Sequence, residues 1–201
     1  MNDPFSNVET PEPGIYPGVD FDEYRKWDAV SNSALFAAAR SMAHYHCRQP
    51  VEETPAMRLG SLCHTGRLEP LLIADRYVVM PLYEVEVRTA NGDIPANPKA
   101  TKAYKEKAAE FARVNAGKII VTQGEYNTMV DLVGAISSHR RAADYLHLGQ
   151  YELSIVWRDD DTGILCKGRI DCWQKAESRV VDLKTTADAS VADKLIYNRA
   201  Y

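Results

Sequence analysis

The chain lacks the features that mark several large classes of protein. Its 201 residues carry 24 Lys and Arg against 28 Asp and Glu, a net charge of −4, so the basic coat of a non-specific nucleic-acid binder is absent. No run approaches the roughly 18 apolar residues of a membrane span. Residues 1–4 are acidic and polar, which argues against a secretory signal. We therefore expect a cytoplasmic protein with no membrane partner, in which any nucleic acid is held by a local basic groove or by metal ions.

Cysteine is also scarce. The four cysteines stand at positions 47, 63, 166 and 172. Their spacing fits neither a CxxC zinc site nor a dense disulfide framework. We expect reduced, mostly buried thiols rather than a metal cluster.

What the chain does contain suits one globular domain. Hydrophobic residues make up 45% and charged residues 26%, enough for a core and too balanced for global disorder. Residues 1–18 are rich in proline and glycine, and we expect an N-terminal arm with little regular structure there. The domain would then span residues 19–201.

Hydrophobic periodicity predicts helices first and strands later. Helices are expected over residues 31–46, 56–68, 99–116 and 122–148, with short extended pieces at 76–80 and 118–121 and a loop at 88–98. Thr122 and Glu125 form the pattern of a capping box before the last of these helices. Alternation then predicts strands at 151–158, 164–174 and 179–184, followed by a helix from 188. The expected fold class is α/β (α+β), an antiparallel meander flanked by helices.

Two strands of this meander bring carboxylates together. Residues two apart on a strand share a face, so Asp182 and Lys184 point the same way. If the hairpin is symmetric about its turn at 175–178, Asp171 lies opposite Asp182 and Arg169 opposite Lys184. Cross-strand Cβ atoms are roughly 4.5–5.5 Å apart, so the two carboxylates would repel each other without a cation. Hard oxygen ligands of this kind suit Mg²⁺ or Mn²⁺.

A third carboxylate joins this face under one condition. Glu152 is added if Gly163 forms a G1-type bulge in the preceding hairpin, and otherwise it is off by one position. The competing interpretation is a solvent-exposed sheet face with scattered charges. The register of Asp171, Asp182 and Lys184 favours the metal site.

These residues resemble a known family. The stretches 168–171 and 181–186 resemble the signature of PD-(D/E)xK nucleases, with Asp182-x-Lys184 in place of the commoner Glu-x-Lys. Further stretches at 31–33, 60–64, 68–70 and 166–171, with Glu152 before Trp157, resemble the exonuclease VIII (RecE-like) branch, which is related to lambda exonuclease and RecB nuclease domains. The resemblance covers about residues 15–190. It implies a restriction-endonuclease-like core with a central mixed sheet.

The resemblance also implies roles for individual residues. The catalytic residues would be Lys184, Asp171, Asp182 and Glu152. The metal would be bound by His64, Asp171, Asp182 and the Leu183 carbonyl. The DNA would be contacted by Ser61, Arg67, Arg169, Thr185 and Thr186. A lone helical histidine is more often structural than a ligand, but Gly60 would let this helix approach another backbone closely, as in RecE-like nucleases that place a histidine at the metal. Lys184 would orient the attacking water, and Glu152 would bind a second ion or position the lysine.

The activity implied is a Mg²⁺-dependent DNA exonuclease, with Mn²⁺ as an alternative ion. It would digest linear duplex DNA from 5′ to 3′, leaving 3′ single strands for recombination or repair. Its expected partners are duplex DNA, a single-strand annealing protein and further copies of the chain in a ring. The alternatives are another PD-(D/E)xK endonuclease or resolvase, and a non-catalytic DNA-binding remnant of the fold.

Two departures from the family pattern qualify these expectations. The Gln-x-x-x-Tyr helix of RecB-like relatives is missing before Tyr201, so we expect a chain whose C-terminal part is shortened and whose activity is low compared with an extended form. No cysteine follows Cys172, so we expect no iron–sulfur cluster.

Overall fold

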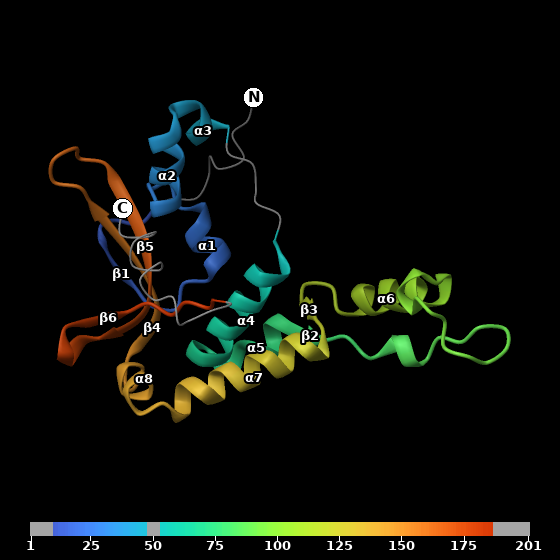
Figure 1. The fold of residues 1–201 in the computed structure, drawn as a ribbon. Coiled ribbons are helices and arrows are strands. Elements are labelled where there is room, and N and C mark those ends of the chain that lie inside the picture. Colours follow the sequence, from blue (N-terminus) through green and yellow to red (C-terminus); the bar gives the residue numbers. More distant parts are fainter. Residues whose placement is uncertain (1–9, 48–52, 187–201) are drawn as a thin grey trace.

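The computed structural model describes residues 10–47 and 53–186. Its main sheet has four antiparallel strands in the order β1-β4-β5-β6, and a separate parallel pair joins β2 to β3 (Figure 1). The strands are β1 (Gly14–Tyr16), β2 (Tyr77–Val79), β3 (Ile119–Val121), β4 (Gln150–Arg158), β5 (Leu165–Gln174) and β6 (Arg179–Val181). The expected α/β class, an antiparallel meander with flanking helices, is confirmed. The expected central mixed sheet is instead an antiparallel sheet beside a small parallel one.

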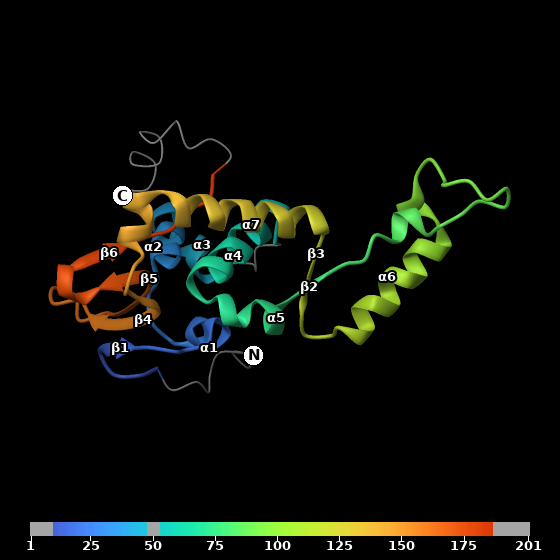
Figure 2. The ribbon, with the colours of Figure 1, turned by 90° about the horizontal axis from the view of Figure 1, so that it is seen from below.

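Helices flank the main sheet. The α-helices are α1 (Phe21–Lys26), α2 (Asn32–Arg40), α3 (Met42–His46), α4 (Pro55–Leu68), α5 (Ile73–Arg76), α6 (Lys102–Val114), α7 (Gln123–Ser138) and α8 (Arg140–Tyr145). Four short 3₁₀ helices cover Pro70–Leu72, Tyr83–Val85, Pro98–Ala100 and Lys175–Glu177. The segment between β2 and β3 carries α6 away from the sheet (Figures 1 and 2). Among the residues that the model describes, no helix has both the length and the hydropathy needed to cross a membrane.

Side-chain caps explain where several helices begin. Thr122 accepts a hydrogen bond from the Glu125 amide at 3.1 Å, and the Glu125 carboxylate accepts one from the Thr122 amide at 2.7 Å. This confirms the expected capping box. Two helices are shorter than expected because a residue in extended conformation ends each and caps the next. His139 separates α7 from α8 (φ −82°, ψ 106°), and Ser41 separates α2 from α3 (φ −176°, ψ 158°).

The two ends of the chain were expected to form an irregular arm and a helix. We expect little regular structure in residues 1–18, of which the structure describes 10–18; there Gly14–Tyr16 forms β1 and pairs with β4 through Ile15 and Ile155. The expectation is wrong for these three residues because an edge strand needs only a few residues and a free neighbouring edge. The helix expected from residue 188 lies outside the described residues.

The register of the meander sets the position of the carboxylates. Pairing of Cys172 with Val181 and of Trp173 with Val180 confirms the symmetric hairpin, which ends at Val181 rather than at residue 184. Continued by one step, this register places Asp182 across from Asp171. On the other side of β5, Tyr151 pairs with Cys172 and Leu153 with Ile170, which places Glu152 across from Asp171. The hairpin that sets this register contains Gly163 with φ +69°, a conformation that favours glycine.

The helix that reaches this sheet is held by its own apolar cluster. Leu62 and Cys63 of α4 are buried against Tyr77, Val121 and Met129. These partners come from β2, β3 and α7, so the small parallel sheet and the long α7 together fix one side of α4. The opposite side of α4 is left to face the main sheet.

Candidate metal centre

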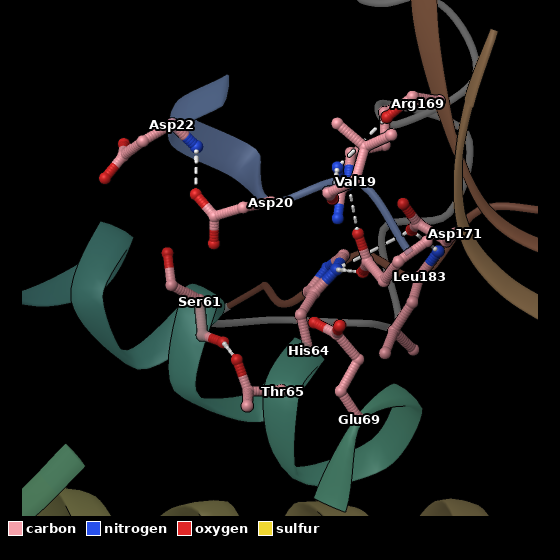
Figure 3. Close-up of polar contacts among 12 residues, drawn as sticks. Val19, Asp20, Asp22, Ser61, His64, Thr65, Glu69, Arg169, Asp171 and Leu183 are labelled. Carbon is pink, nitrogen blue, oxygen red and sulfur yellow. Dashed lines mark hydrogen bonds and ion pairs between the residues drawn. The ribbon is translucent and has the colours of Figure 1, made fainter. Parts of the chain in front are cut away.

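Three side chains from three elements converge on one point. His64 of α4, Glu152 of β4 and Asp171 of β5 each offer one ligand atom, and these atoms all lie within 4.8 Å of one another. Nδ1 of His64 lies 3.7 Å from Oδ2 of Asp171 and 3.9 Å from Oε1 of Glu152. All three side chains are partly buried. Figure 3 shows His64 on α4 pointing toward Asp171 and Leu183.

The chemistry of this donor set fits a hard divalent cation. Mg²⁺ and Mn²⁺ prefer carboxylate oxygens, and an imidazole nitrogen is compatible with Mn²⁺ and other divalent metals. Metal–oxygen bonds of roughly 2.0–2.6 Å require ligand atoms separated by a few ångströms, as they are here. The carboxylates of Glu152 and Asp171 share this partly buried group, and a cation between them would offset their mutual repulsion.

Gly60 allows α4 to come close to the segment after β6. A Cβ atom added at Gly60 would lie 3.1 Å from Oγ1 of Thr185, tighter than most Cβ contacts. The helix therefore lies close to the Thr185 side chain at this position, whereas the sequence suggested a close approach to another backbone. His64 stands one helical turn after Gly60, so the same approach carries the imidazole to the carboxylates.

Glu152 has an unusual backbone. Its φ is +53°, in the left-handed region that residues other than glycine rarely adopt. Its side chain is held by Arg169, whose Nε donates to Oε2 over 2.6 Å. Burial alone would raise the pKa of Glu152, but His64 and Arg169 outweigh burial and lower it below the ordinary value. Glu152 is therefore ionised over a wide pH range.

Asp171 is the centre of the group. The Leu183 amide donates to its Oδ2 over 2.6 Å, which ties the segment after β6 to the carboxylate. Burial raises the pKa of Asp171 above the ordinary value, and the neighbouring Asp182 adds to the rise. The Leu183 amide, His64 and Lys184 oppose it only in part. A cation at this point would favour the ionised form.

The pKa of the His64 imidazole is raised as well, which for a histidine favours the charged form. The Glu152 carboxylate is the largest cause that raises the pKa of His64, burial opposes it, and Asp171 and the Leu183 backbone add to the rise. The raised pKa favours the protonated imidazole, whose charge would compensate the two carboxylates. A proton and a metal ion would compete for this position.

Asp182 and Lys184 lie at the edge of this group. Their side chains form an ion pair with each other, and the Asp182 side chain is 62% exposed. Strand geometry stops at Val181, so the pleat no longer fixes the direction of the Asp182 side chain. The structure therefore brings His64, Glu152 and Asp171 together and leaves Asp182 and Lys184 outside the three converging ligand atoms.

The residues expected to contact DNA fall into two groups. Ser61, Thr185 and Thr186 are exposed, and Ser61 lies on α4 one turn before His64 (Figure 3). The two arginines point inward. Arg67 is half-buried, its Nη2 is 3.5 Å from the Leu146 carbonyl, and its buried Nε has no hydrogen-bond partner among the described residues.

Arg169 has a role that the sequence reasoning missed. Its side chain is 10% exposed, and its guanidinium contacts Glu152, the Val19 carbonyl and Ser154. We therefore revise the expected phosphate contact of Arg169 to an internal one. The signal available in the sequence was its position two residues before Asp171 on one strand, which places both side chains on the same face.

The four cysteines are free thiols, and Cys63 and Cys172 are buried. Cys63 directly precedes His64 and Cys172 directly follows Asp171, and each of these two thiols belongs to an apolar cluster of the core.

Comparison with known proteins places the chain in a family. No curated protein matches the sequence. The model of one family, described as PDDEXK-like domain of unknown function (DUF3799), matches residues 23–199. This match spans most of the chain and includes all three residues of the candidate metal centre, so the chain belongs to this PDDEXK-like family.

Proposed function

We propose that this protein is a divalent-metal-dependent deoxyribonuclease that hydrolyses phosphodiester bonds. The observation that carries the proposal is the convergence of His64, Glu152 and Asp171 within 4.8 Å in a chain of the PDDEXK-like family, whose fold is of the nuclease type. An acidic pair with a histidine is a donor set for Mg²⁺ or Mn²⁺, the ions that assist phosphodiester hydrolysis.

The residues of the site divide into ligands and supporting groups. His64, Glu152 and Asp171 would hold the ion, with Asp182 and the Leu183 carbonyl as further ligands. When bound, such an ion polarises the phosphate and lowers the pKa of a coordinated water. The Leu183 amide donates to Oδ2 of Asp171 and so holds this carboxylate in place beside His64.

Lys184 is the proposed electrostatic catalyst. An ammonium near the scissile phosphate stabilises the negative charge that develops during attack and orients the attacking water. Its present ion pair with Asp182 keeps it beside the strand end that carries both residues. The exposed hydroxyls of Ser61, Thr185 and Thr186 are proposed to contact phosphate oxygens of the DNA.

The finer assignment follows the resemblance found in the sequence. We propose a RecE-like exonuclease that acts from 5′ to 3′ on linear duplex DNA and leaves 3′ single strands for recombination or repair. A single-strand annealing protein and a ring of identical chains are the proposed partners. These points rest on the sequence motifs.

The direct test compares linear and covalently closed duplex DNA, with Mg²⁺, with Mn²⁺ and with EDTA. We expect metal-dependent degradation of the linear DNA and no degradation of the closed circle. A label at the 5′ end should be the first to be released, as a mononucleotide. An Asp171→Asn variant is the catalytic control, and Asp144→Asn on α8 is the matched surface control. Nicking or cutting of the closed circle would instead identify an endonuclease or a resolvase.

One observation favours a second candidate, a non-catalytic DNA-binding protein. Asp182 and Lys184 neutralise each other outside the ligand group, whereas a nuclease needs both at the phosphate. Metal binding and DNA binding without hydrolysis of any substrate in the same experiment would support this candidate.

A further inference from the structure

One face of β5 carries three polar residues in alternating positions. Lys167, Arg169 and Asp171 are each two residues apart, so the pleat directs all three to the same side of the sheet. Asp171 belongs to the candidate metal centre. The other two are buried or nearly so, with Lys167 at 7% exposure and the Arg169 side chain at 10%. A buried positive charge needs hydrogen-bond partners or counter-charges. The partners of Lys167 and Arg169 therefore indicate the role of each side chain.

Lys167 fastens α1 to the sheet. Its Nζ donates to the carbonyls of Tyr24, Arg25 and Trp27 at 3.0, 3.0 and 2.7 Å. These are carbonyls at the C-terminal end of α1, where a positive charge is favourable. The position of α1 is therefore tied to β5.

Arg169 is held in turn by α1 and the residues before it. Its Nη1 donates to the Val19 carbonyl at 3.0 Å and to Oγ of Ser154 at 3.1 Å. Its Cζ lies 5.7 Å from the ring centroid of Phe21 and 6.0 Å from that of Tyr24. A guanidinium with two fixed hydrogen bonds and two aromatic neighbours has little freedom to turn.

A third N–H of this guanidinium, that of Nε, donates to Glu152. Nε of Arg169 and Oε2 of Glu152 are 2.6 Å apart, which leaves Oε1 on the side of His64, 3.9 Å from Nδ1. The backbone of Glu152 is left-handed, with φ +53°. Such a conformation persists where the surroundings over-determine it, and it occurs at functional sites.

We infer that Arg169 is a positioning residue for the metal centre: it binds Oε2 of Glu152 and thereby presents Oε1 to the position shared with His64 and Asp171. Arg169 does not contact the ion or the substrate in this scheme. The inference rests on the proposed function in one respect, because it takes Glu152 to be a metal ligand. Residues that orient ligands contribute strongly to metal affinity, and their loss typically weakens it about 10–100-fold.

The test is a double-mutant cycle on metal binding. Mn²⁺ affinity is measured by isothermal titration calorimetry for the full chain, for Arg169→Gln, for Glu152→Gln and for the double variant. We expect Arg169→Gln to weaken binding at least about tenfold and to cause no further loss when Glu152 is already Gln. Arg158→Gln is the matched control, because Arg158 is an exposed arginine of β4 whose Nη1 donates to the Gly163 carbonyl in the hairpin loop. The Mn²⁺ affinity of this variant should not change.

The cycle separates positioning from a general effect on the fold. Equal losses from Arg169→Gln in both backgrounds, or no loss at all, would overturn the inference. Should Arg169→Gln not fold, Arg169→Lys replaces it, since lysine keeps the charge but lacks the planar fork that makes these contacts. Intermediate affinity for Arg169→Lys supports positioning, and unchanged affinity contradicts it.

A second readout does not depend on a metal. Urea unfolding of the same four proteins without Mn²⁺ reports the coupling of Arg169 to Glu152 directly. Non-additive unfolding midpoints are expected, and additive ones would overturn the inference. If the parent protein binds no Mn²⁺, the proposed function fails while this readout still decides whether Arg169 and Glu152 act as a unit.

Discussion

Nδ1 of His64 lies 3.7 Å from Oδ2 of Asp171, although one residue comes from α4 and the other from β5. Neither secondary structure nor local sequence brings them together. The contact exists because α4 packs on β2, β3 and α7 through one side and on the end of the meander through the other. Its consequences can be measured.

The two aspartates of the hairpin should not be equivalent. Asp171→Asn removes a carboxylate from the centre of the ligand group and should weaken Mn²⁺ binding by at least about tenfold. Asp182→Asn should weaken it less, because the Asp182 side chain is exposed and paired with Lys184. Calorimetric titration of both variants against the parent measures the difference. Equal losses of Mn²⁺ affinity in the two variants would show that Asp182 contributes as much to metal binding as Asp171.

Metal affinity should depend on pH through His64. Because the folded pKa of His64 is raised, its proton stabilises the metal-free fold at low pH, and this contribution is lost as the pH rises through that raised value. A metal requires the neutral imidazole. Mn²⁺ affinity should therefore increase from pH about 6 to pH about 8, across and above the ordinary value of about 6.5. In His64→Gln the affinity should be lower and its pH dependence flatter; an unchanged profile would exclude His64 as a ligand.

Lys184 should affect catalysis more than metal binding. Lys184→Ala removes a charge that matters most in the transition state, so kcat should fall by about 100-fold or more while KM for DNA and Mn²⁺ affinity change little. Lys102→Ala, at an exposed lysine of α6, is the control. Cleavage by Lys184→Ala at the parent rate would remove Lys184 from the mechanism.

The capping box of α7 should contribute to stability in a pH-dependent way. Burial tends to raise the pKa of Glu125, but hydrogen bonds from Thr122 and Arg58 outweigh it and lower the pKa. The contribution of Glu125 is then fully present above its unfolded pKa of about 4.3 and is lost as the pH falls through the lower folded value. Glu125→Gln should cost about 1 kcal/mol at pH about 7 and almost nothing in strong acid.

Urea unfolding at both pH values checks this. The control is Glu110→Gln at an exposed pair with Arg113, which should leave the midpoint nearly unchanged. If Glu125→Gln lowers the free energy of unfolding by the same amount in acid, the loss of stability comes from packing and not from the ionised carboxylate of the cap.

The sequence predicted those parts of the site that depend on strand geometry. Asp171 and Asp182 follow from a period of two and a symmetric turn, and Glu152 from a glycine able to adopt positive φ in the hairpin. These are local rules, and they held for the register of the sheet. They could not foresee that strand geometry would stop at Val181 and that the Asp182 side chain would be exposed and paired with Lys184.

Other features depended on distant contacts. Residues 31–46 and 122–148 have continuous helical periodicity, but Ser41 and His139 each end one helix and cap another with their side chains, a choice that periodicity does not encode. The internal contacts of Arg169 could be predicted only if the position of α1 were known. This helix is distant from β4 and β5 in the sequence but packs on them in the fold. A lone arginine two residues from an aspartate fits a phosphate contact equally well.

The central claim is that His64, Glu152 and Asp171 form one metal centre. The most direct measurement is anomalous diffraction at the manganese edge from crystals grown with Mn²⁺. We predict a single strong peak within about 2.0–2.6 Å of a carboxylate oxygen of Glu152 and of Asp171, with the His64 imidazole facing it. A peak elsewhere, or no peak at a Mn²⁺ concentration that supports DNA cleavage, would contradict the account.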